Sequence, residues 1–261
     1  MASKPKPTPA EKLIKSKDRV RDLAEVFTAK REVDAMCDLI PTISQPHARL
    51  LEPSCGNGNF LAVILERRLT ALDAKVFRRR SPLNPAAKPR KLTTARQIPL
   101  EIGILQVVSN LYGVDISPDN VSECKNRLLT HVQEFYQRNN RHTWQPNPVL
   151  WPAVKHILDH NIIHGNTLLQ TPTCPKDQRI HLSNWVFTGT TAPLDSPAAR
   201  FCQQVFNFAD LYQQPAKPIS ESPFLPWTSL TLPRDSSSSG LPPQSAACAD
   251  LSDLPLFKGN P

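Results

Sequence analysis

The chain has 261 residues, 39% of them hydrophobic, and a formal net charge of +8. This suits one mid-sized domain with tails and favours an acidic partner such as nucleic acid. The six cysteines are scattered without a Cys-x-x-Cys pair, which argues against a disulfide framework and a zinc site. No apolar run approaches the ~20 residues that span a membrane, and the Lys/Pro-rich start is no signal peptide, so we expect a cytoplasmic protein without a membrane segment.

The first segment with a regular pattern is helical. Residues 1–10 carry Lys and Pro without apolar periodicity, which predicts a disordered arm. Between residues 11 and 40 the spacing becomes helical. The apolar face of this helix consists of Val33, Met36, Cys37 and Ile40.

A strand, a tight turn and a second helix follow. Leu50 and Leu51 predict the strand, Gly56-Asn57-Gly58 the turn, and Phe60 to Leu72 the helix. Glycine has no Cβ and therefore permits unusual dihedrals and close approach to a ligand. Only 8 residues are glycine, about half of the usual ~7%. Because four of them end short apolar runs, the pattern indicates a nucleotide-type pocket. They are Gly56, Gly58, Gly113 and Gly165.

Residues 75–97 interrupt this pattern. They are rich in Lys and Arg and contain no acid, which predicts a basic insertion. The insertion is either a solvated loop or a contact with DNA phosphates. A further helix is expected from Pro99 to Asn110.

Three more strands are expected, over Leu111 to Ile116, Asn161 to Asn166 and Ile180 to Phe187. Ser117-Pro118-Asp119 has the residues of a helix start, and a long apolar stripe follows it. Helices between apolar strands imply an α/β domain with a doubly wound, Rossmann-like sheet. We expect this domain to occupy residues 11–212.

Polar side chains follow three of the predicted strands. Glu52 and the glycine turn end the first, Asp115 the second and Asn166 the third. In α/β sheets the ligand lies outside the carboxyl ends of the strands, so these groups are expected to meet there. Asp115 is placed to accept hydrogen bonds from ribose hydroxyls, or alternatively to cap the following helix.

A dinucleotide site is the first alternative for the glycine loop. It needs Gly-x-Gly-x-x-Gly with an acid about 20 residues further on. Here Leu61 stands at the third glycine position and Asp115 lies far downstream. Glu52 also suits a cation better than a pyrophosphate, which favours S-adenosylmethionine with its ammonium and sulfonium groups. A purely structural turn is the other alternative.

Four phrases resemble, in order, consecutive motifs of the adenine-specific (N6) DNA methyltransferases of restriction–modification systems. The phrases are Ala24-Glu25-Val26-Phe27-Thr28-Ala29, Leu51 to Phe60, Tyr112-Gly113-Val114-Asp115-Ile116 and Ile163-His164-Gly165-Asn166-Thr167-Leu168. The resemblance covers residues 19–170. It implies a methyltransferase fold and S-adenosylmethionine as the cofactor.

The resemblance assigns eleven residues to the cofactor: Phe27, Thr28, Glu52, Cys55, Gly56, Asn57, Gly58, Asn59, Asp115, Ile116 and Asn166. Phe27 and Thr28 would line the pocket, and Glu52, Cys55 and residues 56–59 would hold the amino-acid part. Asp115 would bind the ribose, Ile116 would pack on the adenine, and Asn166 would meet its amino group. The family usually has Asp at position 166, and Gly and Pro at positions 24 and 29.

The catalytic signature of that family, Asn- or Asp-Pro-Pro followed by an aromatic, is absent. In it, two oxygens orient the target amino group and the aromatic stacks on a flipped base. The Asn-Pro pairs of this chain begin at Asn84, Asn147 and Asn260, and none lies at the end of the predicted fourth strand, which ends Trp185-Val186-Phe187-Thr188-Gly189. We therefore assign no catalytic residue and expect no metal.

The implied function is direct methyl transfer from S-adenosylmethionine to the exocyclic amine of adenine in DNA. The alternative is a non-catalytic cofactor- or DNA-binding companion of a restriction–modification or phage system. A second methyltransferase or a specificity subunit is then the expected partner, besides DNA.

Residues 213–261 are rich in Pro and Ser, which predicts a disordered tail. Within it, Asp253-Leu254-Pro255-Leu256-Phe257 resembles the Gln-Leu-x-Leu-Phe peptides that dock on the bacterial sliding clamp, without the leading Gln. A sliding clamp is therefore a further candidate partner.

Overall fold

The computed structural model describes residues 13–23, 25–77, 94–139, 145–172, 179–212 and 217–231, and these form an α/β fold. The helices are α1 (Lys17–Leu23), α2 (Lys30–Asp38), α3 (Asn59–Phe77), α4 (Thr94–Ser109), α5 (Pro118–Asn139) and α6 (Leu150–Asn161). The strands are β1 (Leu50–Glu52), β2 (Leu111–Asp115), β3 (Ile162–Asn166), β4 (Thr171–Pro172), β5 (His181–Thr188), β6 (Arg200–Asn207), β7 (Ser220–Glu221) and β8 (Leu225–Pro226). Two short 3-10 helices are η1 (Phe208–Tyr212) and η2 (Trp227–Leu230).

The first sheet has the strand order β1-β2-β3-β4. Strands β1, β2 and β3 are parallel, with Leu50 opposite Leu111 and Gly113 opposite Ile162, and β4 joins β3 in antiparallel direction. The carboxyl ends of β1, β2 and β3 therefore lie along one edge, as the sequence predicted.

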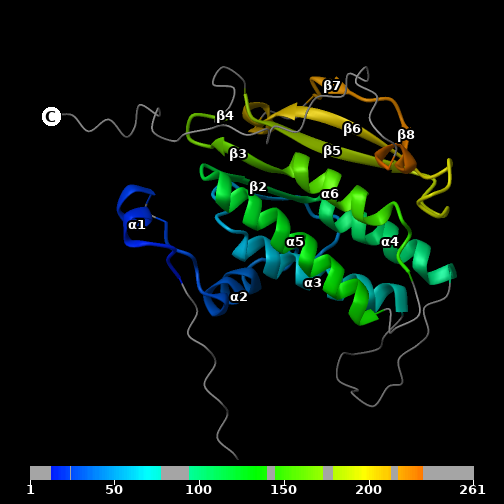
Figure 1. The fold of residues 1–261 in the computed structure, drawn as a ribbon, viewed down its shortest axis with the longest axis horizontal. Coiled ribbons are helices and arrows are strands. Elements are labelled where there is room, and N and C mark those ends of the chain that lie inside the picture. Colours follow the sequence, from blue (N-terminus) through cyan, green and yellow to red (C-terminus); the bar gives the residue numbers. More distant parts are fainter. Residues whose placement is uncertain are drawn as a thin grey trace, which may run out of the picture.

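The two faces of this sheet contact different layers, because side chains alternate along a strand. The residues that pack on the helices are Leu50, Leu111 and Ile162. The residues that pack on Ile180, Leu182 and Phe208 of the second-sheet region are Leu51, Tyr112, Val114 and Ile163. Figure 1 shows β2 and β3 between the second sheet and helices α3 and α5. The α/β class is confirmed, but in the described ranges helices cover one face of the parallel sheet and β-structure covers the other.

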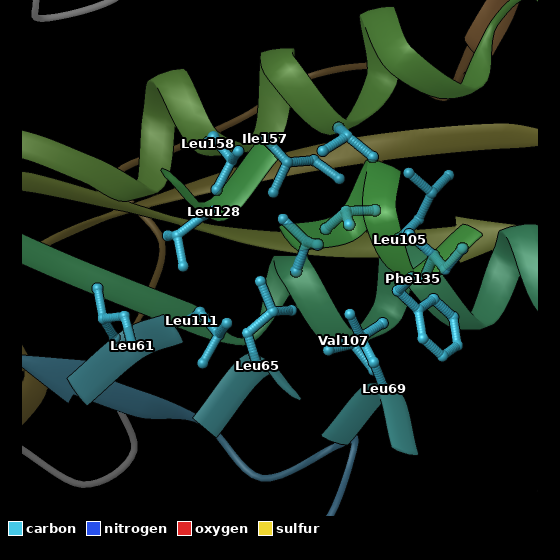
Figure 2. Packing of buried hydrophobic residues seen from close by; sticks show 14 of the residues in the cluster. Leu61, Leu65, Leu69, Leu105, Val107, Leu111, Leu128, Phe135, Ile157 and Leu158 are labelled. Carbon is cyan, nitrogen blue, oxygen red and sulfur yellow. The ribbon is translucent and has the colours of Figure 1, made fainter. Parts of the chain in front are cut away.

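Helix α3 is the centre of the helical layer. Residues 61–65 are all at most 7% exposed, a run that only a helix surrounded on most sides can bury. Figure 2 shows Leu61, Leu65 and Leu69 of α3 near Leu128 of α5 and the leucines and valines of α4 and β2. Burying a large aliphatic side chain stabilises the fold by about 1.5–3 kcal/mol, so this layer is a major source of stability.

The second sheet is a long antiparallel hairpin of β5 and β6, running from His181 opposite Asn207 to Thr188 opposite Arg200. Strands β7 and β8 pair with β6. Trp227 is fully buried and stacks on Phe201 with ring centroids 4.2 Å apart. The prediction of a disordered tail from residue 213 is thus wrong for residues 217–231. Burial of the Trp227 indole offsets the conformational entropy that this Pro-rich segment loses when it is ordered.

Other elements differ from the predictions in specific ways. The expected helix before residue 40 is divided into α1 and α2, and Met36 and Ile40 of its apolar face are half exposed while Val33 and Cys37 are buried. Helix α6 and strand β6 were not predicted. Residues 1–10, positions 78–93 of the basic insertion and the clamp-like segment 253–257 lie outside the described residues.

Candidate functional site at the carboxyl edge of the parallel sheet

The loop between β1 and α3 contains two glycines with positive φ. Gly56 has φ +52° and Gly58 has φ +87°. A Cβ on Gly58 would lie 2.7 Å from Sγ of Cys124, and one on Gly56 would lie 3.3 Å from Cε1 of Phe27. The backbone conformation and the packing around the loop therefore both require glycine at position 58. At position 56 there is little room for a larger side chain.

Asp115, at the end of β2, holds this loop in place. Its Oδ2 accepts a hydrogen bond from Gly56 N–H at 2.8 Å. Its Oδ1 accepts from Ser117 N–H at 2.9 Å and from Nδ2 of Asn120 at 3.2 Å. Asp115 as a whole is 7% exposed. Asp115 thus ties β2 to the glycine loop, and it contacts the start of α5 through Ser117 N–H and the side chain of Asn120, not through a backbone N–H of the helix.

Glu52, at the end of β1, is in a different situation. It is half-buried, and burial raises the pKa of its carboxyl while a hydrogen bond from Ser54 N–H opposes that rise. No Lys, Arg or His within the described ranges forms an ion pair with it. Glu52 is therefore a partly desolvated carboxyl group beside the glycine loop, and it has no cationic partner among the described residues.

The third strand is joined to the same loop. Oγ1 of Thr167 donates to Pro53 O at 2.6 Å. Oδ1 of Asn166, the oxygen expected to meet the adenine, accepts from Leu169 N–H at 3.1 Å and closes a turn. Leu168 in this turn is 95% exposed. The ends of β1, β2 and β3 are therefore connected by hydrogen bonds.

Phe27 and Thr28 also reach the glycine loop. The Phe27 ring lies beside Gly56, and Thr28 O accepts from Nδ2 of Asn59 at 3.1 Å. Oδ1 of Asn59 accepts from Nη1 of Arg127 on α5. Phe27 and Thr28 are thus in contact with the glycine loop, across 31 positions of the sequence in the bond to Asn59.

The remaining predicted residues point less clearly to a ligand. Cys55 is 6% exposed, its N–H donates to Val114 O at 2.9 Å, and its thiol, whose pKa is raised by a hydrogen bond with Cys124 and by burial, lies in the core. Oδ1 of Asn57 is buried and has no hydrogen-bond partner among the described residues. The carbonyl of Ile116 accepts from Nε2 of His164 at 2.9 Å.

An N-terminal polar cluster beside the site was not predicted. Nδ2 of Asn120, which binds Asp115, also donates to Oε2 of Glu25 at 2.8 Å, and Glu25 pairs with Arg19. Arg19 and Lys15 further bind Asp119, each at 2.8 Å. Basic residues of the N-terminal segment thus lie against the acidic start of α5. Their opposite charges were visible in the sequence, but their contact spans about a hundred positions.

The predicted fourth strand does not provide a base-holding group. It is β5, which pairs with β6 in the second sheet, and Nε1 of Trp185 donates to Oδ1 of Asn161 at 3.0 Å in the interior. Within the described ranges, β1 pairs only with β2. The position at which the resemblance would put the Asn-Pro-Pro-aromatic motif therefore has no counterpart among the described residues.

The predicted residues at the ends of β1, β2 and β3 thus meet at one edge, where Asp115 is hydrogen-bonded by the protein and Glu52 forms no ion pair within the described ranges. The described residues hold no group of three or more His, Cys, Asp or Glu that could bind a metal ion, and none of their helices is long and apolar enough to cross a membrane. No family model, curated protein or solved structure matches the chain.

Proposed function

We propose that this chain binds S-adenosylmethionine at the carboxyl edge of the parallel sheet, as a protein of the adenine-specific DNA methyltransferase type with an incomplete Rossmann-like sheet. The observation that carries the proposal is Glu52, a half-buried carboxylate without a cationic partner beside a glycine loop. A buried charge is costly until it is paired, so this acid favours a cationic ligand.

The residues of the edge fit this cofactor in part. Glu52 would pair with its ammonium or sulfonium group. Oδ2 of Asp115 has accepted one hydrogen bond and keeps capacity for a ribose hydroxyl, whereas Oδ1 already accepts two. The bound cofactor would supply a methyl group for direct displacement.

Two functions remain open beyond cofactor binding. One is methyl transfer to the exocyclic amine of adenine in DNA. The other, a non-catalytic companion that needs a second subunit, is supported by the absence of an Asn-Pro-Pro-aromatic sequence and by the use of Trp185 in packing. The net charge of +8 is compatible with DNA binding in both.

Calorimetric titration with S-adenosylmethionine tests the cofactor proposal. Glu52→Gln keeps the shape of the side chain and removes its charge, and should weaken binding by about tenfold or more. Glu134→Gln, at an exposed acid on α5, is the matched control and should bind like the wild type. Absence of binding by the wild-type chain, or equal effects of the two variants, would overturn the proposal.

Transfer of a tritiated methyl group to unmethylated DNA separates the two functions. Transfer by the isolated chain would establish the enzyme and exclude the companion. Cofactor binding without transfer would favour the companion, and the assay would then be repeated with a cognate catalytic subunit.

A further inference from the structure

A cavity of about 330 Å³ lies on the helical side of the glycine loop. Its walls come from the N-terminal segment, from α2, from the first turns of α3 and from the middle of α5. Phe27, Val33 and Val63 give it apolar surface, and Asn57 and Asn59 of the loop border it. Glu52, Asp115 and Asn166 do not line it, whereas Phe27, Asn57 and Asn59 are also among the residues assigned to the cofactor.

Arg127 is the group in this wall that lacks a matching charge. Its Nη1 donates to Oδ1 of Asn59, and no carboxylate among the described residues lies within ion-pair distance of it. Arg67 on the neighbouring helix, by contrast, pairs with Asp34 at 3.0 Å and Asp38 at 2.7 Å. Arginine carries five N–H donors, so Arg127 keeps most of its donors for a further partner.

Asn59 orients this arginine. Its Nδ2 donates to Thr28 O at 3.1 Å, which fixes the amide so that its oxygen faces the guanidinium. The guanidinium is thus held at the cavity wall by a neutral acceptor that does not neutralise its charge. A pre-oriented arginine is suited to bidentate binding of carboxylate or phosphate.

The other titratable groups of the wall are Lys30, Glu66 and His131. Lys30 binds Asp34 at 2.7 Å, and Glu66 is exposed. Because Asp34 offsets the charge of Lys30, the formal charges left on the wall are those of Arg127 and of the exposed Glu66. Its volume is near the lower limit of the ~300–1,000 Å³ that is usual for small-molecule sites.

We propose that this cavity is a binding site for a small anion with an apolar body, a carboxylate or phosphate ester, with Arg127 as its anion-binding residue. The apolar part packs on Phe27, Val33 and Val63, and the anion receives N–H donors from Arg127. The cavity shares Phe27, Asn57 and Asn59 with the residues assigned to S-adenosylmethionine but has different charged residues, so variants of Arg127 and of Glu52 distinguish the two proposals.

Phenyl phosphate is the probe for this site, titrated into the full chain by calorimetry in a phosphate-free buffer. We expect one molecule to bind per chain. Phenol, which lacks the anion, and inorganic phosphate, which lacks the apolar ring, should each bind about tenfold more weakly. Arg127→Met should weaken phenyl phosphate by about tenfold or more. Arg138→Met, at an exposed position on the same helix, is the matched control and should change the affinity less than about twofold.

Three results would overturn the inference: no binding of phenyl phosphate, equal losses for Arg127→Met and Arg138→Met, or phenol binding as tightly as phenyl phosphate. Urea unfolding of each variant establishes whether it folds. If Arg127→Met does not fold, Ala62→Leu decides, because the larger side chain narrows the cavity from α3. A folded Ala62→Leu chain should lose phenyl phosphate binding, and wild-type affinity in that variant would contradict the site.

Discussion

The two sides of the glycine loop differ in the sign of the charge that lacks a partner. At the strand edge Asp115 is occupied by three protein donors, and the acid without a cation is Glu52. In the helical cavity the cation without an anion is Arg127. Because a half-buried charge gains most from a ligand that neutralises it, one loop separates a site suited to cations from a site suited to anions. The unpaired charges, more than the motif letters, indicate what each side binds.

The largest effect is expected from a substitution that removes the Asp115 carboxylate, which connects β2, the glycine loop and the start of α5. Asp115→Ala leaves the N–H groups of Gly56 and Ser117 without their acceptor, and we expect a loss of about 3–5 kcal/mol in the free energy of unfolding. Urea denaturation measures it, with the exposed Asp195→Ala as the control. A loss below about 1 kcal/mol would mean that Asp115 does not hold the edge, and that its carboxylate is not committed to protein donors.

Alanine substitutions at the two loop glycines should reduce the free energy of unfolding by different amounts. Gly58→Ala combines a φ of +87° with a Cβ 2.7 Å from Cys124 Sγ, and we expect a loss of about 2–3 kcal/mol. Gly56→Ala, at φ +52° and 3.3 Å from the edge of a ring, should cost about 1 kcal/mol. Cys124→Ala in the Gly58→Ala background should recover part of the loss, because it removes the sulfur atom. Equal costs at the two positions would contradict the packing of α5 on the loop.

A smaller effect is expected at the N-terminal segment, which forms a wall of the cavity through Phe27. Arg19→Met removes the pairing with Glu25 and Asp119 and should cost about 1 kcal/mol, less at high salt. It should also weaken phenyl phosphate more than S-adenosylmethionine, which would sharpen the separation of the two sites. Arg21→Met, whose partner Asp22 is exposed, is the control and should change neither stability nor affinity measurably. Equal effects of the two variants on unfolding would argue against a docked segment.

The smallest effect concerns the pH dependence at Glu52. Its pKa is raised in the folded state, so its ionisation disfavours folding above the folded pKa, and its contribution to stability is largest below the unfolded pKa. Glu52→Gln should therefore raise the unfolding midpoint at pH 7, and the difference from the wild type should vanish as the pH falls below about 4. Saturating S-adenosylmethionine should reverse this order at pH 7, since only the wild type can pair with the cation. A midpoint of Glu52→Gln below the wild type at pH 7 without ligand would show that Glu52 has a partner in the protein.

Much of the parallel-sheet half was predictable because its signals are local. Apolar runs ending at Glu52, Asp115 and Asn166 became the carboxyl ends of β1, β2 and β3. Helix α6 was missed although Leu150, Val154 and Ile157 recur at helical spacing, since Pro152 falls in its first turn, where proline is tolerated. The β5–β6 sheet was only half predicted, because β6 alternates weakly and the strands that complete it come from a Pro-rich segment.

The sequence by itself determined the order of the elements from β1 to β3, apart from α6, and the glycine turn at positions 56 and 58, because periodicity and backbone freedom depend on near neighbours. It also placed Glu52, Asp115 and Asn166 at a common edge, since parallel strands end together. Only the tertiary structure decided which charges are paired: Asp115 meets Gly56, and Arg127 meets an amide and no acid. Such pairing depends on contacts across 59 and 68 positions, which no local pattern encodes.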